Sequence, residues 1–125
     1  MTVQRIESRH RDRVKLGFGA LAYLGFSPTQ QAKVFGHQIY RRKELRGVKI
    51  ELGRYMSWEN QERVDCLVDI ATGISSLFGE IKKYRYVWLT TPLESLDGKS
   101  PKEFLINGGL DQVRQVLGLI RRVTG

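Results

Sequence analysis

The sequence contains few of the residues that build redox and metal sites. It has one cysteine and two histidines in 125 residues. The single cysteine, Cys66, excludes an intramolecular disulfide and any metal site made of several cysteines. The histidines, His10 and His37, lie far apart and have no further Cys or His spaced to complete a zinc site. We therefore expect no metal and no cofactor, and we interpret Cys66 as a core residue within an apolar helical pattern rather than as a reactive thiol.

Long apolar runs are absent as well. No stretch approaches the roughly eighteen consecutive apolar residues that a membrane-spanning helix needs. Residues 1–13 are polar and charged, and they lack the apolar segment of a signal peptide. The sequence therefore predicts neither a membrane partner nor secretion, and the cytoplasm is the expected location.

Recognisable catalytic motifs are also missing. Residues 17–22 fit the glycine pattern of a dinucleotide-binding fingerprint, but that motif needs a buried strand before it, and residues 11–15 are too charged for one. We interpret these glycines as positions of close helix packing. No paired carboxylates and no nucleophile with its base carry a local signature. The sequence therefore predicts that the chain is not an enzyme.

Acidic side chains are scarce in the first 54 residues. Residues 1–15 carry five basic and two acidic side chains, residues 16–54 carry seven and two, and residues 55–125 carry nine of each. The whole net charge of +8 therefore lies before residue 55. This asymmetry predicts that the first part of the chain faces a polyanion and that the second part faces a different partner. A solvated basic surface without a partner is the alternative.

Apolar residues recur at helical spacing along most of the chain, which favours an all-α fold. The segments Ser27-Pro28-Thr29-Gln30 and Ser100-Pro101-Lys102-Glu103 both have the order of a capping box with proline at the first helical position. Residues 47–56 are expected to form a connector with room for a short extended piece, and Gly79 is expected to end or bend the longest helix. The predicted helical segments are 13–25, 27–36, 38–46, 57–81, 82–91, 100–106 and 110–122.

The segment 38–46 is predicted to be a short helix with a basic exposed face. It follows the helix 27–36 across a glycine-containing turn, and this order outlines a helix-turn-helix. A helix fits the major groove of DNA, and arginine binds guanine with two hydrogen bonds. The alternative is that Tyr40 lies in the core and the arginines are solvated. We predict DNA contacts by Gln38, Tyr40, Arg41, Arg42, Lys43 and Arg46, with Arg5, Arg9, Arg11 and Arg13 as an arm along the phosphates.

An ordered set of short motifs covers residues 57–125. The set comprises Phe78-Gly79, Trp88-Leu89-Thr90-Thr91-Pro92, Leu96-Asp97-Gly98-Lys99-Ser100-Pro101, Phe104-Leu105, Gly109 and the stretch 113–117. In this order and spacing, the set resembles the toxin-binding domain of the Xre/MbcA/ParS antitoxin family. The first part of the chain resembles the Xre-like N-terminal region of that family, although the basic connector 41–54 matches no family feature. Trp88, Leu89, Pro92, Leu96 and Pro101 are interpreted mainly as scaffold.

The resemblance implies an antitoxin that neutralises a cognate RES-domain toxin, a class of enzyme that consumes or transfers ADP-ribose from NAD. It further implies that the C-terminal part covers or enters the NAD cleft of that toxin. Arg121 and Arg122 would then face a pocket built for a substrate with a pyrophosphate; alternatively, they only complement the helix dipole. The residues to which toxin contact is assigned in this way are Pro101, Phe104, Leu105, Val113, Val116, Leu117, Ile120, Arg121 and Arg122.

These observations together predict an all-α protein with an N-terminal helix-turn-helix-like bundle, residues 1–56. A helical toxin-binding domain with one long central helix is expected to follow, residues 57–125. The expected function is that of a type II antitoxin that binds its toxin and represses its own operon as a homodimer on a palindromic DNA operator. The alternative is a stand-alone helix-turn-helix regulator of transcription whose C-terminal half only dimerises.

Overall fold

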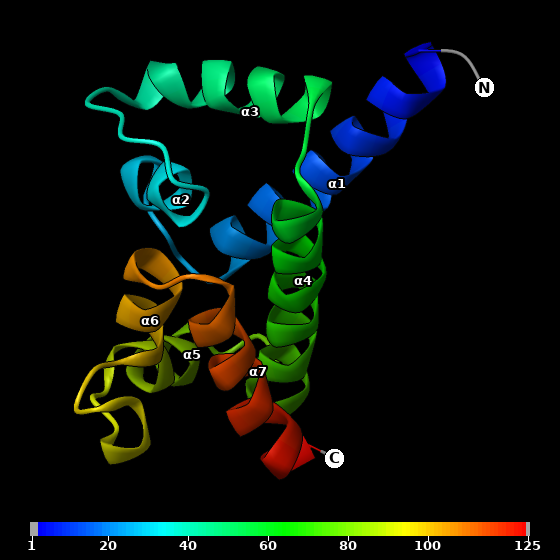
Figure 1. The fold of residues 1–125 in the computed structure, drawn as a ribbon. Helices are drawn as coiled ribbons and strands as arrows, with labels where there is room; N and C mark the ends of the chain where they lie inside the picture. Colours follow the sequence, from blue (N-terminus) through cyan, green and yellow to red (C-terminus); the bar gives the residue numbers. More distant parts are fainter. Residues whose placement is uncertain (1–2, 125) are drawn as a thin grey trace.

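The chain folds into α-helices joined by short loops and turns (Figure 1). The structure is a computed structural model that describes residues 3–124, and the side chains of residues 10–124. No strand occurs between residues 3 and 124, which confirms the all-α prediction. Over the same residues, no helix has both the length and the apolar character needed to cross a membrane. The helices are α1 (Val3–Tyr23), α2 (Pro28–Val34), α3 (Leu45–Arg54), α4 (Trp58–Phe78), α5 (Lys82–Thr90), α6 (Pro101–Asn107) and α7 (Leu110–Thr124), with short 3₁₀ turns η1 (Arg42–Glu44) and η2 (Glu94–Leu96).

Helix α4 forms the centre of the fold. It packs against both α1 and α7 (Figure 1). The side chains of Val64, Leu67, Ile70 and Ile74 recur along one face of α4, and none is more than 1% exposed. Helix α3 lies against α1, and α6 contacts α2, α5 and α7. A single hydrophobic core therefore runs through the chain, and it crosses the predicted boundary between residues 56 and 57.

The predicted helix ends are confirmed where local chemistry determines them. Oγ of Ser27 accepts a hydrogen bond from the Gln30 amide at 3.3 Å, and Oε1 of Gln30 accepts one from the Ser27 amide at 2.9 Å. The Ser100 and Glu103 pair repeats this capping box at 3.2 and 3.5 Å. Gly79 ends α4 with a φ of 59°, in the left-handed region where glycine carries no steric cost.

The structure contradicts the predicted boundaries between residues 38 and 56. Residues 38–41 lie in a loop, and the only helical segment before residue 45 in this stretch is the short turn η1. The predicted connector 47–56 is instead largely α3. The predicted basic helix 38–46 is therefore wrong, and so is the connector.

Packing against α1 explains why α3 forms where the sequence favoured a connector. Leu45, Val48 and Leu52 follow each other at helical spacing, and each is at most 8% exposed. Burial of this face outweighs the low helix propensity of the two glycines in the segment. Residues 35–44 separate α2 from α3, which is longer than the roughly 3–4-residue turn of a helix-turn-helix. The predicted helix-turn-helix is not confirmed.

Two glycines allow the long helices to approach each other closely. A Cβ atom at Gly73 of α4 would overlap Cγ2 of Ile120 on α7. A Cβ atom at Gly17 of α1 would lie 3.0 Å from Cγ2 of Val64 on α4. Close packing is thus confirmed at Gly17, whereas a Cβ atom at Gly19 would meet nothing within 4 Å. The absence of a side chain at Gly73 therefore allows the short distance at which α7 packs against α4.

Replacement of Gly73 by alanine tests this seat. Alanine favours helix over glycine by about 1 kcal/mol, but overpacking a core costs about 1–3 kcal/mol. We expect Gly73→Ala to lower the free energy of unfolding by up to about 2 kcal/mol in urea titrations, because the clash outweighs the gain in propensity. Gly118→Ala on α7 is the matched control, since a Cβ atom there meets nothing within 4 Å. Stabilisation of both variants would contradict the close approach.

Candidate functional site

The side chains predicted to contact a toxin lie mostly inside the fold. Apart from Arg121 and Arg122, all of them are at most 9% exposed or belong to the buried set of their helix. They form the inner faces of α6 and α7 and pack with α4 and α5. In this structure they fill the core, so other residues of α6 and α7 form the outer surface. Arg121 and Arg122 are the members of the set that are exposed to solvent. The residues in the core are Pro101, Phe104, Leu105, Val113, Val116, Leu117 and Ile120.

A shallow groove runs between the outer face of α7 and the turn η2. Its volume is about 310 Å³, and Arg114 and Arg122 lie at its sides. Leu119 contributes aliphatic surface, and Gly118 leaves the groove open because it has no side chain. The groove is therefore both cationic and apolar. A groove of this kind suits a protein surface that offers carboxylates or carbonyl oxygens beside an apolar contact. Its lining residues are Ser95, Leu96, Arg114, Gln115, Gly118, Leu119 and Arg122.

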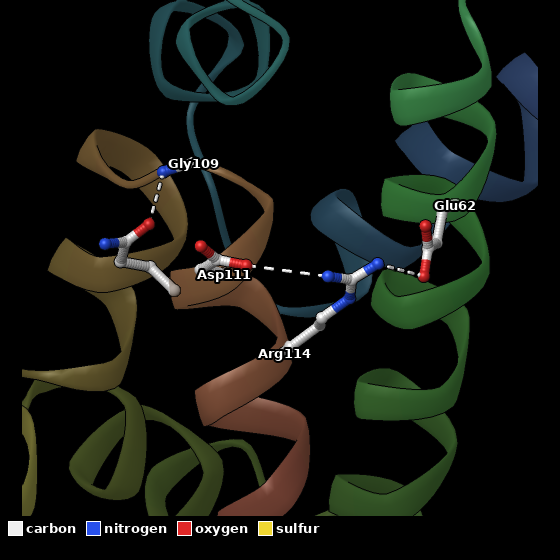
Figure 2. A network of polar contacts seen from close by, with 5 residues as sticks. Glu62, Gly109, Asp111 and Arg114 are labelled. Carbon is white, nitrogen blue, oxygen red and sulfur yellow. Dashed lines mark hydrogen bonds and ion pairs between the residues drawn. The ribbon is translucent and has the colours of Figure 1, made fainter.

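Ion pairs between α4 and α7 decide which of these arginines are available. Arg114 places Nη2 at 2.5 Å from Oε1 of Glu62 and Nη1 at 3.5 Å from Oδ1 of Asp111 (Figure 2). The hydrogen bond to Glu62 raises the pKa of the Arg114 guanidinium above its usual value. Arg121 places Nη2 at 3.4 Å from Oδ2 of Asp69.

The two interhelical ion pairs set the register of α7. Both join residues 52 positions apart in the sequence, so α4 and α7 run in the same direction and in step. Arg122, one residue beyond the second pair, forms no ion pair with any described carboxylate. Its charge is therefore the one at the groove that remains available to a partner.

A tight turn holds the other wall of the groove in place. Leu93 donates its amide to the carbonyl of Lys99 at 3.1 Å, and Asp97 and Gly98 at the tip have φ values of 58° and 78°. Leu96 is 1% exposed and anchors the turn in the core. Leu89 is equally buried and Trp88 partly so, which fits their interpretation as scaffold, although Pro92 lies on the surface.

Comparison with known proteins identifies the segment that carries this groove. Residues 75–122 match the family model of the antitoxin Xre/MbcA/ParS C-terminal toxin-binding domain. This segment is similar to the toxin-binding domain of Xre/MbcA/ParS antitoxins. No curated protein and no solved structure matches the chain.

The Xre/MbcA/ParS segment begins in the last turn of α4 and ends in the last turn of α7. It contains every residue that lines the groove between α7 and η2. The match to a toxin-binding domain supports an antitoxin role for the protein.

The residues predicted to contact DNA lie in a different part of the fold. All of them are exposed, so the alternative that Tyr40 is a core residue is wrong. Arg42, Lys43 and Arg46 line a second groove of about 960 Å³, which α1, η1 and α3 enclose. Gln38, Tyr40 and Arg41 lie in the loop before η1 and do not line that groove.

This second groove, called the basic groove below, has cations at its sides and an apolar floor. Lys15 of α1 and Lys49 of α3 complete its charged residues, and none of the residues that line it is acidic. Phe18 lies at its floor, with Nζ of Lys49 at 5.2 Å from the ring centroid. Sequence reasoning missed Lys15 and Lys49, and only the helical spacing of Arg46 and Lys49 could have indicated the latter.

Glu44 holds the loop that leads into η1, the turn that carries Arg42 and Lys43 of the basic groove. Its Oε2 accepts hydrogen bonds from the amides of Tyr40 at 2.7 Å and Arg41 at 3.0 Å. The hydrogen bond from the Arg41 amide has the larger effect and that from Tyr40 the smaller one, and together they lower the pKa of the Glu44 carboxyl below its usual value. The carboxylate thereby fixes the entry to η1.

The predicted basic arm is part of helix α1. Arg13 donates to Oδ1 of Asp65 at 3.0 Å, so it joins α1 to α4. Arg11 is exposed, and the side chains of Arg5 and Arg9 lie outside the described residues. A role of this segment along DNA phosphates stays a prediction.

Proposed function

We propose that this protein is the antitoxin of a type II toxin–antitoxin pair and that it neutralises a RES-domain toxin that consumes NAD. The match of residues 75–122 to a toxin-binding domain carries the proposal. The chain's own core occupies the inner face of α7, so the groove beside η2 is the surface that we assign to the toxin.

The final turns of α7 suit this role because they combine charge with apolar surface. Leu119, Arg122 and Val123 share one face of the helix, and Val123 is 70% exposed. Arg122 has no ion pair with a described carboxylate, so its contact with an acidic or carbonyl group of the toxin would break no existing bond. We propose that this end of α7 covers the NAD cleft of the toxin and blocks substrate entry.

Charge reversal at Arg122 tests the assignment. The chain is co-expressed with the protein encoded by the adjacent gene, and toxin capture and NAD consumption are measured. We expect wild type to bind the toxin and to stop NAD loss, and Arg122→Glu to weaken binding by about tenfold or more, as at an interface hot spot. Arg54→Glu is the control, because Arg54 is exposed but lies on α3, outside residues 75–122.

Two results would contradict this proposal. One is that the adjacent gene product neither co-purifies with the chain nor consumes NAD. The other is that Arg122→Glu binds the toxin as tightly as Arg54→Glu, which would place the toxin on another surface. NAD turnover by the chain alone would revive an enzymatic function.

We further propose that the basic groove binds operator DNA and that the chain represses its own operon, as a homodimer on a palindromic site. The observation that favours this second activity is the cluster of five cations with no acidic residue among the lining residues. Cations in such a groove bind backbone phosphates and release counterions, so affinity falls steeply with salt.

A gel-shift salt series with the chain's own promoter tests the DNA proposal. Each phosphate contact contributes about 0.9 to the slope of log affinity against log salt. We expect the double variant Arg46→Ala, Lys49→Ala to lose affinity and to lower that slope by about 1–2. Arg54→Ala, on the same helix but outside the groove, should behave as wild type. An unchanged slope in the double variant would exclude the basic groove as the DNA site.

A further inference from the structure

A third cavity lies where the basic first part of the chain meets the toxin-binding segment. Its volume is about 960 Å³, within the range of small-molecule sites, about 300–1,000 Å³. Helix α2 and the loop after it, from Thr29 to Ile39, form one wall. Residues 57–63 at the start of α4 form the floor, and residues 106–108 at the end of α6 form the other wall. It is separate from both grooves described above, because it shares no lining residue with either.

Arg63, on the floor of this cavity, is a buried cation that forms no ion pair with a described carboxylate, although Glu59 lines the same cavity. Arg63 is only 9% exposed, and its Nε has no hydrogen-bond partner among the residues that the structure describes. Nη1 donates to Oδ1 of Asn60, which is a neutral group. No described carboxylate forms an ion pair with Arg63. Burial lowers the pKa of this guanidinium, and the charge of Glu59 offsets that effect only in part.

A buried charge without a partner is costly, which indicates that something else completes this site. The other buried arginine, Arg85, differs because its guanidinium lies over the Tyr23 ring at 4.1 Å. The surroundings of Arg63 favour an anion. The cavity lies at the N-terminus of the 21-residue helix α4, where the helix dipole is positive, and the exposed cation Lys33 stands on the wall above.

We propose that this cavity binds a small molecule with an oxyanion group, a phosphate or a carboxylate, and that Arg63 and Lys33 provide its positive charges. The guanidinium supplies hydrogen-bond donors in the planar arrangement that suits either group. A bound anion would contact the loop after α2 and the end of α6 together. The site would therefore join the two parts of the chain that face different partners, and its existence does not depend on the toxin or on DNA.

Titration of the ¹⁵N-labelled chain by NMR tests this proposal. Inorganic phosphate and acetate are added in separate series, with sodium chloride at matched ionic strength as the control salt. We expect saturable shifts of the amides of residues 33–39, 57–63 and 106–108 with at least one oxyanion and not with chloride. The better of the two anions identifies the group that the site prefers.

Substitutions assign the binding to named charges. Arg63→Met keeps the aliphatic length of the side chain and should weaken oxyanion binding by about tenfold or more, the size of one charge-assisted hydrogen bond. Arg85→Met, the matched removal of a buried arginine elsewhere, should leave the affinity unchanged. Lys33→Met alters only an exposed side chain, so it tests the site even if Arg63→Met fails to fold, and we expect weaker binding there while Lys49→Met has no effect.

Three results would overturn the proposal. The first is the absence of saturable shifts with both anions, and the second is a set of shifts centred on the basic groove. The third is full affinity in Lys33→Met together with full affinity or misfolding in Arg63→Met, which would leave Arg63 a purely structural residue.

Discussion

The seating of α7 on α4 is the constraint on which the surface of the second half of the chain depends. Gly73 removes the side chain that would otherwise meet Ile120, so the two helices pack at close range over their shared length. The ion pairs of Glu62 with Arg114 and of Asp69 with Arg121 then fix the position of α7 along the axis of α4. With its apolar stripe buried in this way, α7 presents to a partner an outer face on which Leu119 and Val123 lie beside arginines. The groove beside η2 is a direct result, because Ser95 and Leu96 of η2 line it opposite that same outer face.

In the first half of the chain, a glycine at a helix contact and an ion pair beside it again position two helices, α1 and α4. Gly17 lets α1 approach Val64 of α4, and Arg13 pairs with Asp65 beside that contact. Helix α3 packs on the other side of α1 through its apolar residues, which leaves the cations of α1, η1 and α3 around one groove. The excess of basic residues in the first part of the sequence thus produces a basic groove that is separate from the groove beside η2. The basic groove repels cations and attracts polyanions, whereas the second half has as many acidic as basic side chains, and its arginines Arg114 and Arg121 pair with carboxylates.

Local chemistry allowed parts of this fold to be predicted from sequence, and long-range packing prevented the rest. The capping boxes at Ser27 and Ser100 and the end of α4 at Gly79 depend on neighbouring residues alone, and all three were predictable. Helix α3 was not, because Gly47, Gly53 and the alternation around Ile50 mimic a connector, and only burial against α1 decides the outcome. For the candidate site, the motif order indicated the right segment, as the family match confirms. It directed attention to the apolar stripe of α7, which fills the core, while the groove residues Gln115 and Gly118 have no distinctive pattern. Lys15 joins the basic groove from a distant helix, which no local pattern could reveal.

The central claim is that a toxin binds the outer face of α7, and hydroxyl-radical footprinting of the purified chain with and without its toxin tests it most directly. Val123 and Trp58 are equally exposed, at 70% and 71%, but Trp58 lies at the start of α4, outside residues 75–122. The account predicts that the toxin protects Leu119 and Val123 from oxidation and leaves Trp58 and Tyr40 as reactive as in the free chain. Protection of Trp58 and Tyr40 with undiminished oxidation of Leu119 and Val123 would contradict it.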